Sequence, residues 1–583
     1  METPGDDTQT GQPDPEPSGE AKHSRRIRLV LRARAAARAA VMGSRRSWGW
    51  LREQWRQGRS PAMWLLGLMT GIASGYAALG FILAIHGVSL IVFGANHDAL
   101  ASGVDALPGW RVFVGPVIGG LIVAGLLYIG QRYNWLTETR AHAVADVVEA
   151  RAVRSGRVIL KTGLLSALIS AISLGSGGSA GREGPAVHLG GALASFGARQ
   201  LGIPARAVRT LLACGAAAAV AASFNAPIAG ALFAFEIVLG HYALRSIAPV
   251  AIASVAGAVV SRIHLGATPA FTVPAMGAAS AWDLPGVFLL SLAAAGLAIA
   301  FVHASVHAPR VVAQQAERWR IPLWALPPIG GIGIGLLALP MPEILGVGYE
   351  ATSNALGGQY AVLFLLGLIV MKLVATGMTL GFRFGGGVFS PALYLGAMLG
   401  AAFGSAIGLA TGGETGGVPF YAVVGMGAVA GAALGAPLST TLIVFELTAN
   451  YEASVAVLVA VSIATVLTQA ATGGSIFQKQ ILRHGYDLSR GQSRVLLQTI
   501  RVRDIMAPYE GDEADMDTAS GAPTLYDDDY LGRAIGLLSA ESLDGAPVRS
   551  RSDDQPVVGW LSRADAHAAY ARALEATHEE EHL

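Results

Sequence analysis

Cysteine and charge are both scarce in this sequence. Its 583 residues include one cysteine, and 14% of the residues are charged while 52% are hydrophobic. Because Cys214 has no second cysteine to pair with, an intrachain disulfide is excluded, and a lone thiol makes no metal site. The apolar run around Cys214 predicts a small buried side chain instead. So little charge over so long a chain indicates a membrane setting, and we expect neither an enzyme nor a bound metal.

Apolar segments recur along most of the chain. They cover residues 62–94, 110–130, 158–178, 185–200, 209–239, 246–262, 284–305, 321–340, 360–380, 388–410, 418–447 and 453–471. A membrane-spanning helix needs about 20 apolar residues, and several of these segments are shorter or are interrupted by glycine or proline. Broken and tilted helices are tolerated in a membrane only where they line a cavity or pack on protein. The pattern therefore predicts an all-α, multi-pass transporter or channel body.

Charge is concentrated ahead of the first apolar segment, in residues 1–60, which we expect to be a disordered arm. The first 20 residues hold six acidic and no basic side chains, so we expect no cleavable signal peptide. Residues 22–59 hold twelve Lys and Arg against one acidic side chain. The positive-inside rule then predicts a cytoplasmic N-terminus beside anionic lipid headgroups. Because no nucleic-acid-binding fold accompanies this charge, we expect no nucleic-acid partner.

One carboxylate stands in an otherwise apolar, glycine-rich stretch, where residues 175–185 read GSGGSAGREGP. Charge at membrane depth is costly and usually functional, which singles out Glu183. Pro185 suits the first turn of a helix, and the free N–H groups and positive dipole end of a helix start attract anions. A carboxylate there can occupy the anion site or swing out of it. The pattern predicts a gate; the alternative is a capping carboxylate that stays fixed.

The apolar body contains an internal repeat. The segment PAVHLG at residues 185–190 returns as PALYLG at residues 391–396. Internal repeats are typical of transporters, whose binding site lies at the interface between the copies. We therefore expect two membrane repeats, residues 61–270 and 284–485.

The second copy again approaches its proline, Pro391, through glycines, which predicts a second helix start facing the same anion. Phe389 stands there in the place that Glu183 has in the first copy. Two further carboxylates, Glu236 and Glu446, recur at equivalent helix ends. Their equivalence favours a structural role in satisfying nearby backbone groups over a role in transport.

The two motifs carry a family resemblance. Residues 181–185, GREGP, together with residues 387–391, GVFSP, resemble the CLC chloride channels and chloride/proton antiporters. The resemblance covers about residues 60–485 and implies a homodimer, with a separate pore in each subunit built from inverted repeats of tilted helices. It implies chloride as the anion and Glu183 as the external gate. The implied anion-binding residues are Gly181, Arg182, Gly184, Val388 and Phe389.

Two positions depart from the family pattern around the anion. Many members place a Gly-Ser-Gly-Ile-Pro run before the gate, and here residues 141–145 read AHAVA, with His142 replacing the serine. An imidazole N–H can bind chloride, and protonation would strengthen that contact; the alternative is a half-buried interfacial histidine. Near the last membrane helix, Phe477 replaces a tyrosine whose hydroxyl binds the anion. Phe477 is a candidate for lining the pore, and core packing is an equal alternative.

A third departure concerns protons. Proton-coupled members tend to carry an internal glutamate just after the position of Glu236, and this chain has Ile237 there. An aliphatic side chain cannot relay protons, so the sequence favours passive, channel-like chloride conduction. Chloride/proton exchange is the alternative, supported by the retained Glu183. In either case we expect a protein of the cytoplasmic membrane with both termini in the cytoplasm.

The composition changes sharply after the membrane segments. Residues 486–583 look soluble, with an acidic loop at residues 510–517. The stretches 502–506, 524–529 and 556–565 resemble one CBS motif, which implies a small α/β tail. CBS motifs form pairs, and some pairs bind adenine nucleotides. Because this chain has a single copy, that copy would need the partner subunit in order to pair. A structural tail, an adenine-nucleotide sensor and a CBS-regulated membrane sensor are the alternatives; no other cofactor is expected.

Overall fold

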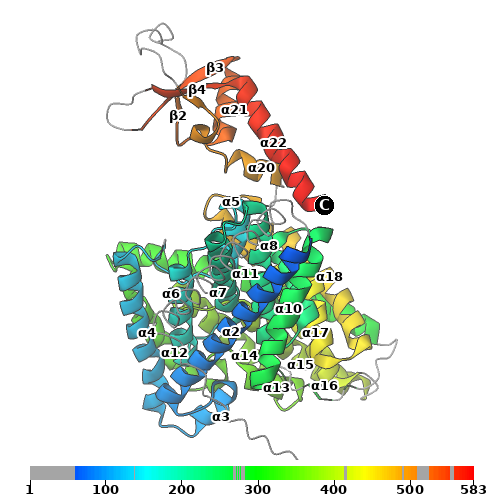
Figure 1. Ribbon diagram of the computed structural model, residues 1–583. Helices are drawn as coiled ribbons and strands as arrows, with labels where there is room; N and C mark the ends of the chain where they lie inside the picture. The colour runs from blue at the N-terminus through cyan, green and yellow to red at the C-terminus, as the bar shows by residue number, and fades with distance from the viewer. Residues whose placement is uncertain are drawn as a thin grey trace, which may run out of the picture. The chain divides into compact units, whose positions relative to one another are not determined.

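The computed structural model describes residues 60–136, 138–266, 283–412, 416–488, 492–508, 524–551 and 557–582, with four single positions between 271 and 276 (Figure 1). Two predictions fall outside these residues, the disordered arm up to residue 59 and the acidic loop at 510–517. From Met63 on, the chain forms one compact unit, and Met1–Ala62 is a separate one.

The first membrane repeat is built from helices between Ser60 and Leu265. In chain order they are α2 (Ser60–Phe93), η1 (His97–Ala99), α3 (Leu100–Asp105), α4 (Gly109–Arg132), α5 (Val144–Val153), α6 (Leu160–Gly175), α7 (Glu183–Gln200), α8 (Ala205–Phe224), α9 (Pro227–Phe233), η2 (Ala234–Leu239) and α10 (Leu244–Leu265). Cys214 is fully buried in α8, which confirms its prediction as a small buried side chain.

The second membrane repeat is built from helices between Asp283 and Leu482. They are α11 (Asp283–Arg318), η3 (Leu323–Ala325), α12 (Pro327–Ala338), η4 (Pro342–Ile344), α13 (Tyr349–Leu356), α14 (Val362–Gly381), α15 (Phe389–Thr411), α16 (Gly417–Leu434), α17 (Pro437–Thr448), α18 (Tyr451–Thr472) and α19 (Ile476–Leu482). Over the described residues, nine helical segments are long and apolar enough to cross a membrane. Other helices of the two repeats are much shorter than these nine segments. The predicted all-α body of full and broken helices is therefore confirmed.

Glycine pairs let the central helices of each repeat cross at backbone contact. A Cβ atom on Gly190 of α7 would lie 2.5 Å from the carbonyl oxygen of Gly215 of α8. In the second repeat a Cβ on Gly396 of α15 would lie 2.3 Å from the carbonyl oxygen of Gly425 of α16. Small residues at helix contacts give van der Waals packing where lipid supplies no hydrophobic drive. The same device therefore holds the centre of both copies.

Glu236 and Glu446 connect the two repeats reciprocally. The Glu236 carboxylate accepts hydrogen bonds from the backbone N–H groups of Leu438 (3.0 Å) and Ser439 (2.8 Å), in the first turn of α17. The Glu446 carboxylate on α17 accepts from Ile228 (3.0 Å) and Ala229 (2.7 Å), in the first turn of α9. Each carboxylate thus satisfies free N–H groups at the start of the other repeat's helix. This arrangement requires the two short segments to lie antiparallel, as inverted repeats do.

The C-terminal part carries a small sheet. Its elements are α20 (Gln492–Leu497), η6 (Val502–Asp504), β1 (Ala507–Pro508), β2 (Leu525–Tyr526), α21 (Leu531–Ala540), β3 (Gly545–Arg549), β4 (Val557–Ser562) and α22 (Arg563–His582). The strands are ordered β1-β4-β3-β2, with β2 parallel to β3 and the other pairs antiparallel. Val502, Leu538, Val548 and Leu561 are fully buried in its core. A small α/β tail is therefore present, and its kinship to CBS domains stays a prediction.

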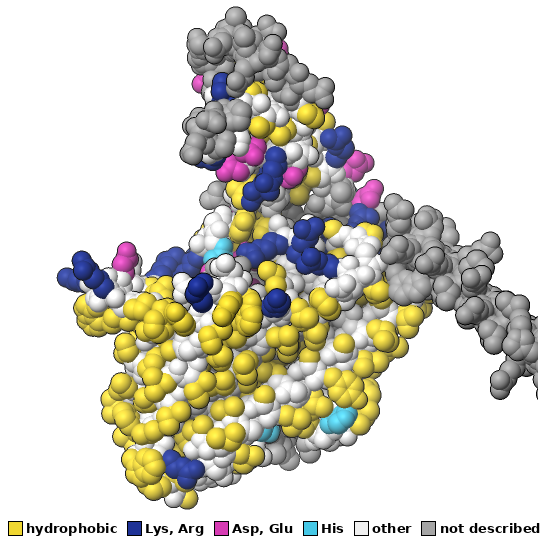
Figure 2. Space-filling model, turned by 60° about the vertical axis from the view of Figure 1, so that its left-hand side comes forward, with side chains coloured by type: hydrophobic (Ala, Val, Ile, Leu, Met, Phe, Trp, Pro, Cys, Tyr) yellow, Lys and Arg dark blue, Asp and Glu magenta, His cyan; other side chains and the backbone are white. Residues whose placement is uncertain are grey.

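The surface of the membrane unit is apolar. Figure 2 shows hydrophobic side chains over most of its visible face, with Lys and Arg gathered along one rim. Large side chains such as Ile91, Leu363 and Leu409 are more than four-fifths exposed. In water such a surface would drive aggregation, whereas lipid tails cover it at no loss.

Candidate anion site

Two glycine-rich segments bring the starts of α7 and α15 together. Gly181 and Gly387 form an antiparallel bridge, N–H to carbonyl oxygen, with distances of 2.8 and 2.7 Å. A Cβ atom on Gly387 would lie 2.9 Å from the backbone nitrogen of Gly184, so only glycine allows this approach. The predicted pairing of two helix starts, one from each repeat, is present in the structure.

Glu183 is the first residue of α7, and its side chain is 1% exposed. Its Oε1 accepts hydrogen bonds from the hydroxyl groups of Ser390 (2.6 Å) and Tyr349 (3.1 Å). Oε2 has no hydrogen-bond partner among the described residues. Ser390 lies in the first turn of α15, so the carboxylate reaches from one helix start to the other. The negative group thus occupies a place where two positive dipole ends converge.

Tyr349 is a site residue that the sequence analysis missed. It begins α13 after Gly348, whose φ of +87° suits glycine, and it is buried. Its ring also supports the Arg182 guanidinium, whose Cζ lies 4.5 Å from the ring centroid. A Gly-x-Gly-Tyr run before a short helix was the available signal, but only the fold brings it within reach of residue 183.

Arg182 lines a cavity next to the start of α7. It is 7% exposed, donates to the carbonyl oxygen of Ser223 (3.0 Å) and approaches Asp98 at 3.9 Å. Arg182, Asp98 and Tyr349 line a cavity of about 540 Å³. Burial raises the pKa of Asp98, but the nearby His86 side chain, 3.4 Å away, and the charge of Arg182 outweigh this effect and leave the pKa at about 2. An ionised Asp98 therefore partly offsets the positive charge beside the gate.

Phe389 contributes its backbone to the site, while its ring packs away in an aromatic cluster. The ring centroid lies 5.2 Å from that of Phe224 and 6.0 Å from that of Phe233. Val388, which precedes α15, is also buried. Pro391 stands at the third position of α15, as Pro185 does in α7, so both prolines lie in first turns. The candidate anion-binding groups of this segment are therefore the backbone N–H groups of residues 388 and 389, which the sequence analysis also named.

A third helix start, that of α5, reaches the same place. A Cβ on Gly184 would lie 3.0 Å from the Cα of Gly387 and 3.3 Å from the Cβ of Ala143, which precedes α5. His142 comes one residue earlier and is 5% exposed. The structure therefore brings His142 into the neighbourhood of the two helix starts, as the family spacing predicts.

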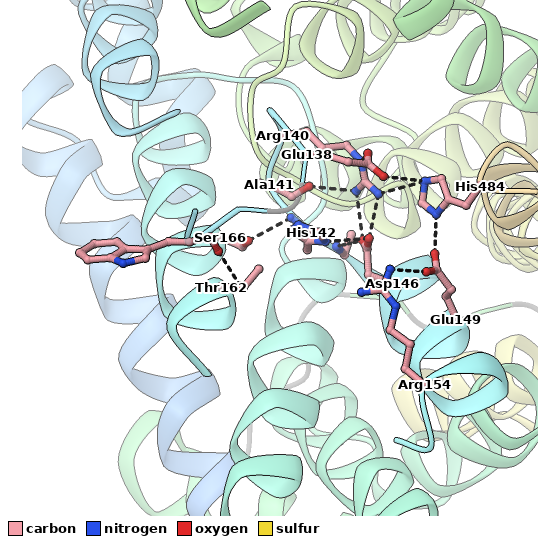
Figure 3. Close-up of polar contacts among 12 residues, drawn as sticks. Glu138, Arg140, Ala141, His142, Asp146, Glu149, Arg154, Thr162, Ser166 and His484 are labelled. Carbon is pink, nitrogen blue, oxygen red and sulfur yellow. Dashed lines mark hydrogen bonds and ion pairs between the residues drawn. The ribbon is translucent and has the colours of Figure 1, made fainter. Parts of the chain in front are cut away.

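The His142 side chain is held in a polar network (Figure 3). Its backbone N–H donates to the Ser166 hydroxyl (3.1 Å), and its Nδ1 lies 2.7 Å from Oδ1 of Asp146. Asp146 also accepts two hydrogen bonds from the Arg140 guanidinium, at 3.0 and 2.8 Å. Since Nδ1 is engaged, any imidazole N–H offered to an anion would be that of Nε2. The assignment of His142 to the anion stays a prediction.

The structure places Phe477 near Ile237. It is 4% exposed in α19, whose start is capped by Ser475 and Gln478. Phe477 and Ile237 line a common cavity. Both apolar replacements that the sequence analysis noted are therefore close to one cavity, and pore lining by Phe477 stays a prediction.

The fold is that of a multi-pass membrane protein, and the candidate site pairs two helix starts around one buried carboxylate. The family described as voltage gated chloride channel matches residues 119–469, which is more than half of the chain, and the protein belongs to that family. The resemblance to CLC proteins drawn from residues 181–185 and 387–391 is thus confirmed.

Named relatives agree with this assignment. A ClcB-like chloride channel protein of Ralstonia nicotianae is 30% identical over 426 residues, covering 72% of this chain and 97% of the relative. The voltage-gated ClC-type chloride channel ClcB of Escherichia coli is 29% identical over 424 residues, covering 72% and 99%.

Solved structures share the fold. A slow cyanobacterial Cl-/H+ antiporter matches with a TM-score of 0.63 and 22% identity, covering 73% of this chain and 98% of that one. A CLC-type fluoride/proton antiporter matches with a TM-score of 0.58 and 21% identity, covering 72% and 97%. At this identity the likeness establishes the CLC fold.

Proposed function

We propose that this protein exchanges chloride for protons across the cytoplasmic membrane, with Glu183 as the gate that both ions share. The observation that carries the proposal is the position of the Glu183 carboxylate. It is buried between two helix starts and held by the hydroxyls of Ser390 and Tyr349. Chloride has to displace this carboxylate, and protonation neutralises it and weakens its hold on the dipole ends. Alternate occupation of one place by chloride and by a carboxylate links the two ions.

Chloride as the transported anion is supported by the names of the relatives, which describe chloride channels. Exchange is supported by the names of two proteins with the same fold, both antiporters that carry protons. This reverses the order of the sequence analysis, which placed passive conduction first on the strength of Ile237 and Phe477. A passive pore would need the gate to stay out of the site, and the Glu183 carboxylate lies inside it.

The inner face is proposed from the distribution of charge. The connection between α4 and α6 carries Arg140, Arg151, Arg154 and Arg157. Cytoplasmic loops are the ones enriched in Lys and Arg, so we assign this side to the cytoplasm. Figure 2 shows most of the visible basic side chains of the membrane unit along its upper rim and one group at the opposite end, which supports this orientation. Assembly as a homodimer, with the C-terminal tails paired, follows from the family resemblance and is part of the proposal.

The test is a flux measurement in liposomes that contain the purified protein, under an outward chloride gradient. Membrane voltage is clamped with potassium and valinomycin while external chloride and external pH are recorded together. If the protein exchanges the two ions, chloride efflux drives protons into the liposomes although no proton gradient is present at the start. Chloride efflux without proton movement would establish passive conduction instead.

Two variants locate the gate. Glu183→Gln keeps the side-chain shape and removes the titratable group, so chloride should still move while proton movement is lost. The matched control is Glu317→Gln, an exposed carboxylate at the end of α11, which should retain both fluxes. Proton movement that persists in Glu183→Gln would refute the gate assignment.

A further inference from the structure

A connected set of titratable side chains lies on the inner side of the membrane unit, around α5 and the end of α19 (Figure 3). His484 contacts Glu149 through Nδ1 and Glu138 through Nε2, the latter at 3.1 Å. Glu138 accepts a hydrogen bond from Arg140 at 2.7 Å, and Arg140 in turn binds Asp146. The set begins at partly exposed groups, since the Glu138 side chain is 41% exposed, and reaches the buried Asp146. It therefore leads from water into the protein.

The inner end of this set is a pair of stacked imidazoles. The rings of His142 and His188 lie 5.4 Å apart, centroid to centroid, and 20° from parallel. Both residues are buried, at 5% and 2% exposure. Nδ1 of His188 has no hydrogen-bond partner among the described residues. A buried polar nitrogen without a partner is destabilising by itself, so its retention points to a function.

Three charged or titratable groups act on His188. They belong to Asp146 on α5, to Arg140 in the loop before it, and to His142 when it is protonated. Because Arg140 binds Asp146 through two hydrogen bonds, these two charges compensate each other. Oδ1 of Asp146 also lies 2.7 Å from Nδ1 of His142, so a carboxylate stands beside a proton on the imidazole pair. Two imidazolium ions at the separation of these two rings would repel each other.

One member of the pair, His188, lies on the helix that carries the gate. His188 follows Glu183 by five residues in α7, which separates them by about 7.5 Å along the helix axis at 1.5 Å per residue. The position where coupled relatives have a carboxylate is apolar here, as Ile237. Protons that reach Glu183 from the inner side therefore need another titratable group, and His188 is a buried imidazole on the helix that Glu183 begins.

We propose that the His142–His188 stack is the inner proton-binding site of this protein and replaces the missing internal carboxylate; the proposal rests on the exchange function above. A proton from the inner solution binds an imidazole nitrogen of the pair, which becomes imidazolium. The proton then passes through water to the Glu183 carboxylate, which becomes a neutral carboxylic acid, and the imidazole returns to its neutral form. No bond other than those to the proton forms or breaks.

The experiment uses the full-length protein in the same voltage-clamped liposomes and measures the ratio of protons to chloride moved. His188→Gln keeps a polar side chain that does not titrate, and we expect the ratio to fall roughly tenfold or more, as for loss of a proton-transfer group. Adding Ile237→Glu to this variant should restore the ratio, which a purely structural role for His188 would not allow. His303→Gln, an exposed histidine on α11, is the matched control and should keep the wild-type ratio.

The outcomes separate this proposal from the proposed function. If the wild-type protein moves chloride without protons, exchange itself is refuted and the inner site with it. If the wild-type protein couples the ions and His188→Gln keeps the full ratio, exchange stands and the inner site is refuted. Should His188→Gln fail to fold, His142→Gln decides, because it removes the other imidazole while leaving an amide to bind Asp146. An unchanged ratio in that variant overturns the proposal.

Discussion

Tyr349 offers the sharpest test of how the gate is held. Its hydroxyl donates one of the two hydrogen bonds that Glu183 Oε1 accepts, at 3.1 Å, and both side chains are buried. Tyr349→Phe removes this bond and keeps the ring on which Arg182 rests. The change therefore weakens the closed position of the gate without changing the apolar packing around it.

The magnitude follows from the charge on the acceptor. A hydrogen bond to a charged group contributes about 1.5–3 kcal/mol, and the 3.1 Å distance argues for the lower figure. Since each 1.4 kcal/mol is a factor of ten, the carboxylate should occupy the site about tenfold less favourably. Where the closed state dominates, the apparent affinity for chloride rises by the same factor.

Calorimetric titration of the purified protein with chloride measures this affinity. Tyr349→Phe should bind chloride about tenfold more tightly than wild type. Glu183→Gln should exceed both. Tyr394→Phe is the matched control, because Tyr394 is a buried tyrosine whose hydroxyl has no hydrogen-bond partner among the described residues. Equal affinities for Tyr349→Phe and wild type, or an equal gain in Tyr394→Phe, would show that the hydroxyl does not hold the gate.

Three further predictions concern stability, measured as thermal unfolding in detergent. Glu446→Gln removes the charge that caps α9, and should destabilise by about 1–2 kcal/mol, with Glu236→Gln giving a similar loss; no shift in either variant would refute the capping role. The hydrogen bond to Glu149 raises the pKa of His484 above 6.5. A raised histidine pKa stabilises fully below 6.5 and loses that contribution as the pH rises through the raised value. Unfolding temperature should thus fall between about pH 6 and about pH 8.5 more in wild type than in His484→Gln, and equal slopes would refute the argument. Gly396→Ala forces a methyl group onto a backbone carbonyl and should destabilise by about 1–3 kcal/mol, whereas Gly408→Ala on the same helix, where a Cβ meets open space, should not.

The sequence alone could predict those parts of the site that depend on local chain chemistry. Glycines before a proline at 185 and again at 391 predict two helix starts, because glycine allows close backbone approach and proline suits a first turn. A carboxylate between them predicts a gate. The recurrence of these patterns also predicts the repeats and, through the family resemblance, the fold that the comparisons establish.

Other parts depend on contacts between distant segments and leave no local signal. Tyr349 is 166 residues from Glu183 in the chain, and its hydroxyl meets the gate only because α13 packs beside α15. His188 reads in the sequence as an ordinary residue of a repeated helix. Its stacking on His142 follows from the packing of α5 on α7, which the spacing of apolar residues does not specify.

The reciprocal capping by Glu236 and Glu446 makes neither half of the membrane unit self-sufficient. Residues 60–265 without their counterpart would leave the start of α9 with open N–H groups in an apolar medium, and the second half would do the same at α17. Unsatisfied backbone groups in hydrocarbon are each destabilising by several kcal/mol. The N–H groups at the start of α9 in the first half therefore stay unsatisfied until the second half has been inserted beside it. For the same reason, a duplicated ancestor that came to depend on this reciprocal capping could not return to a single-copy protein by deletion of either half.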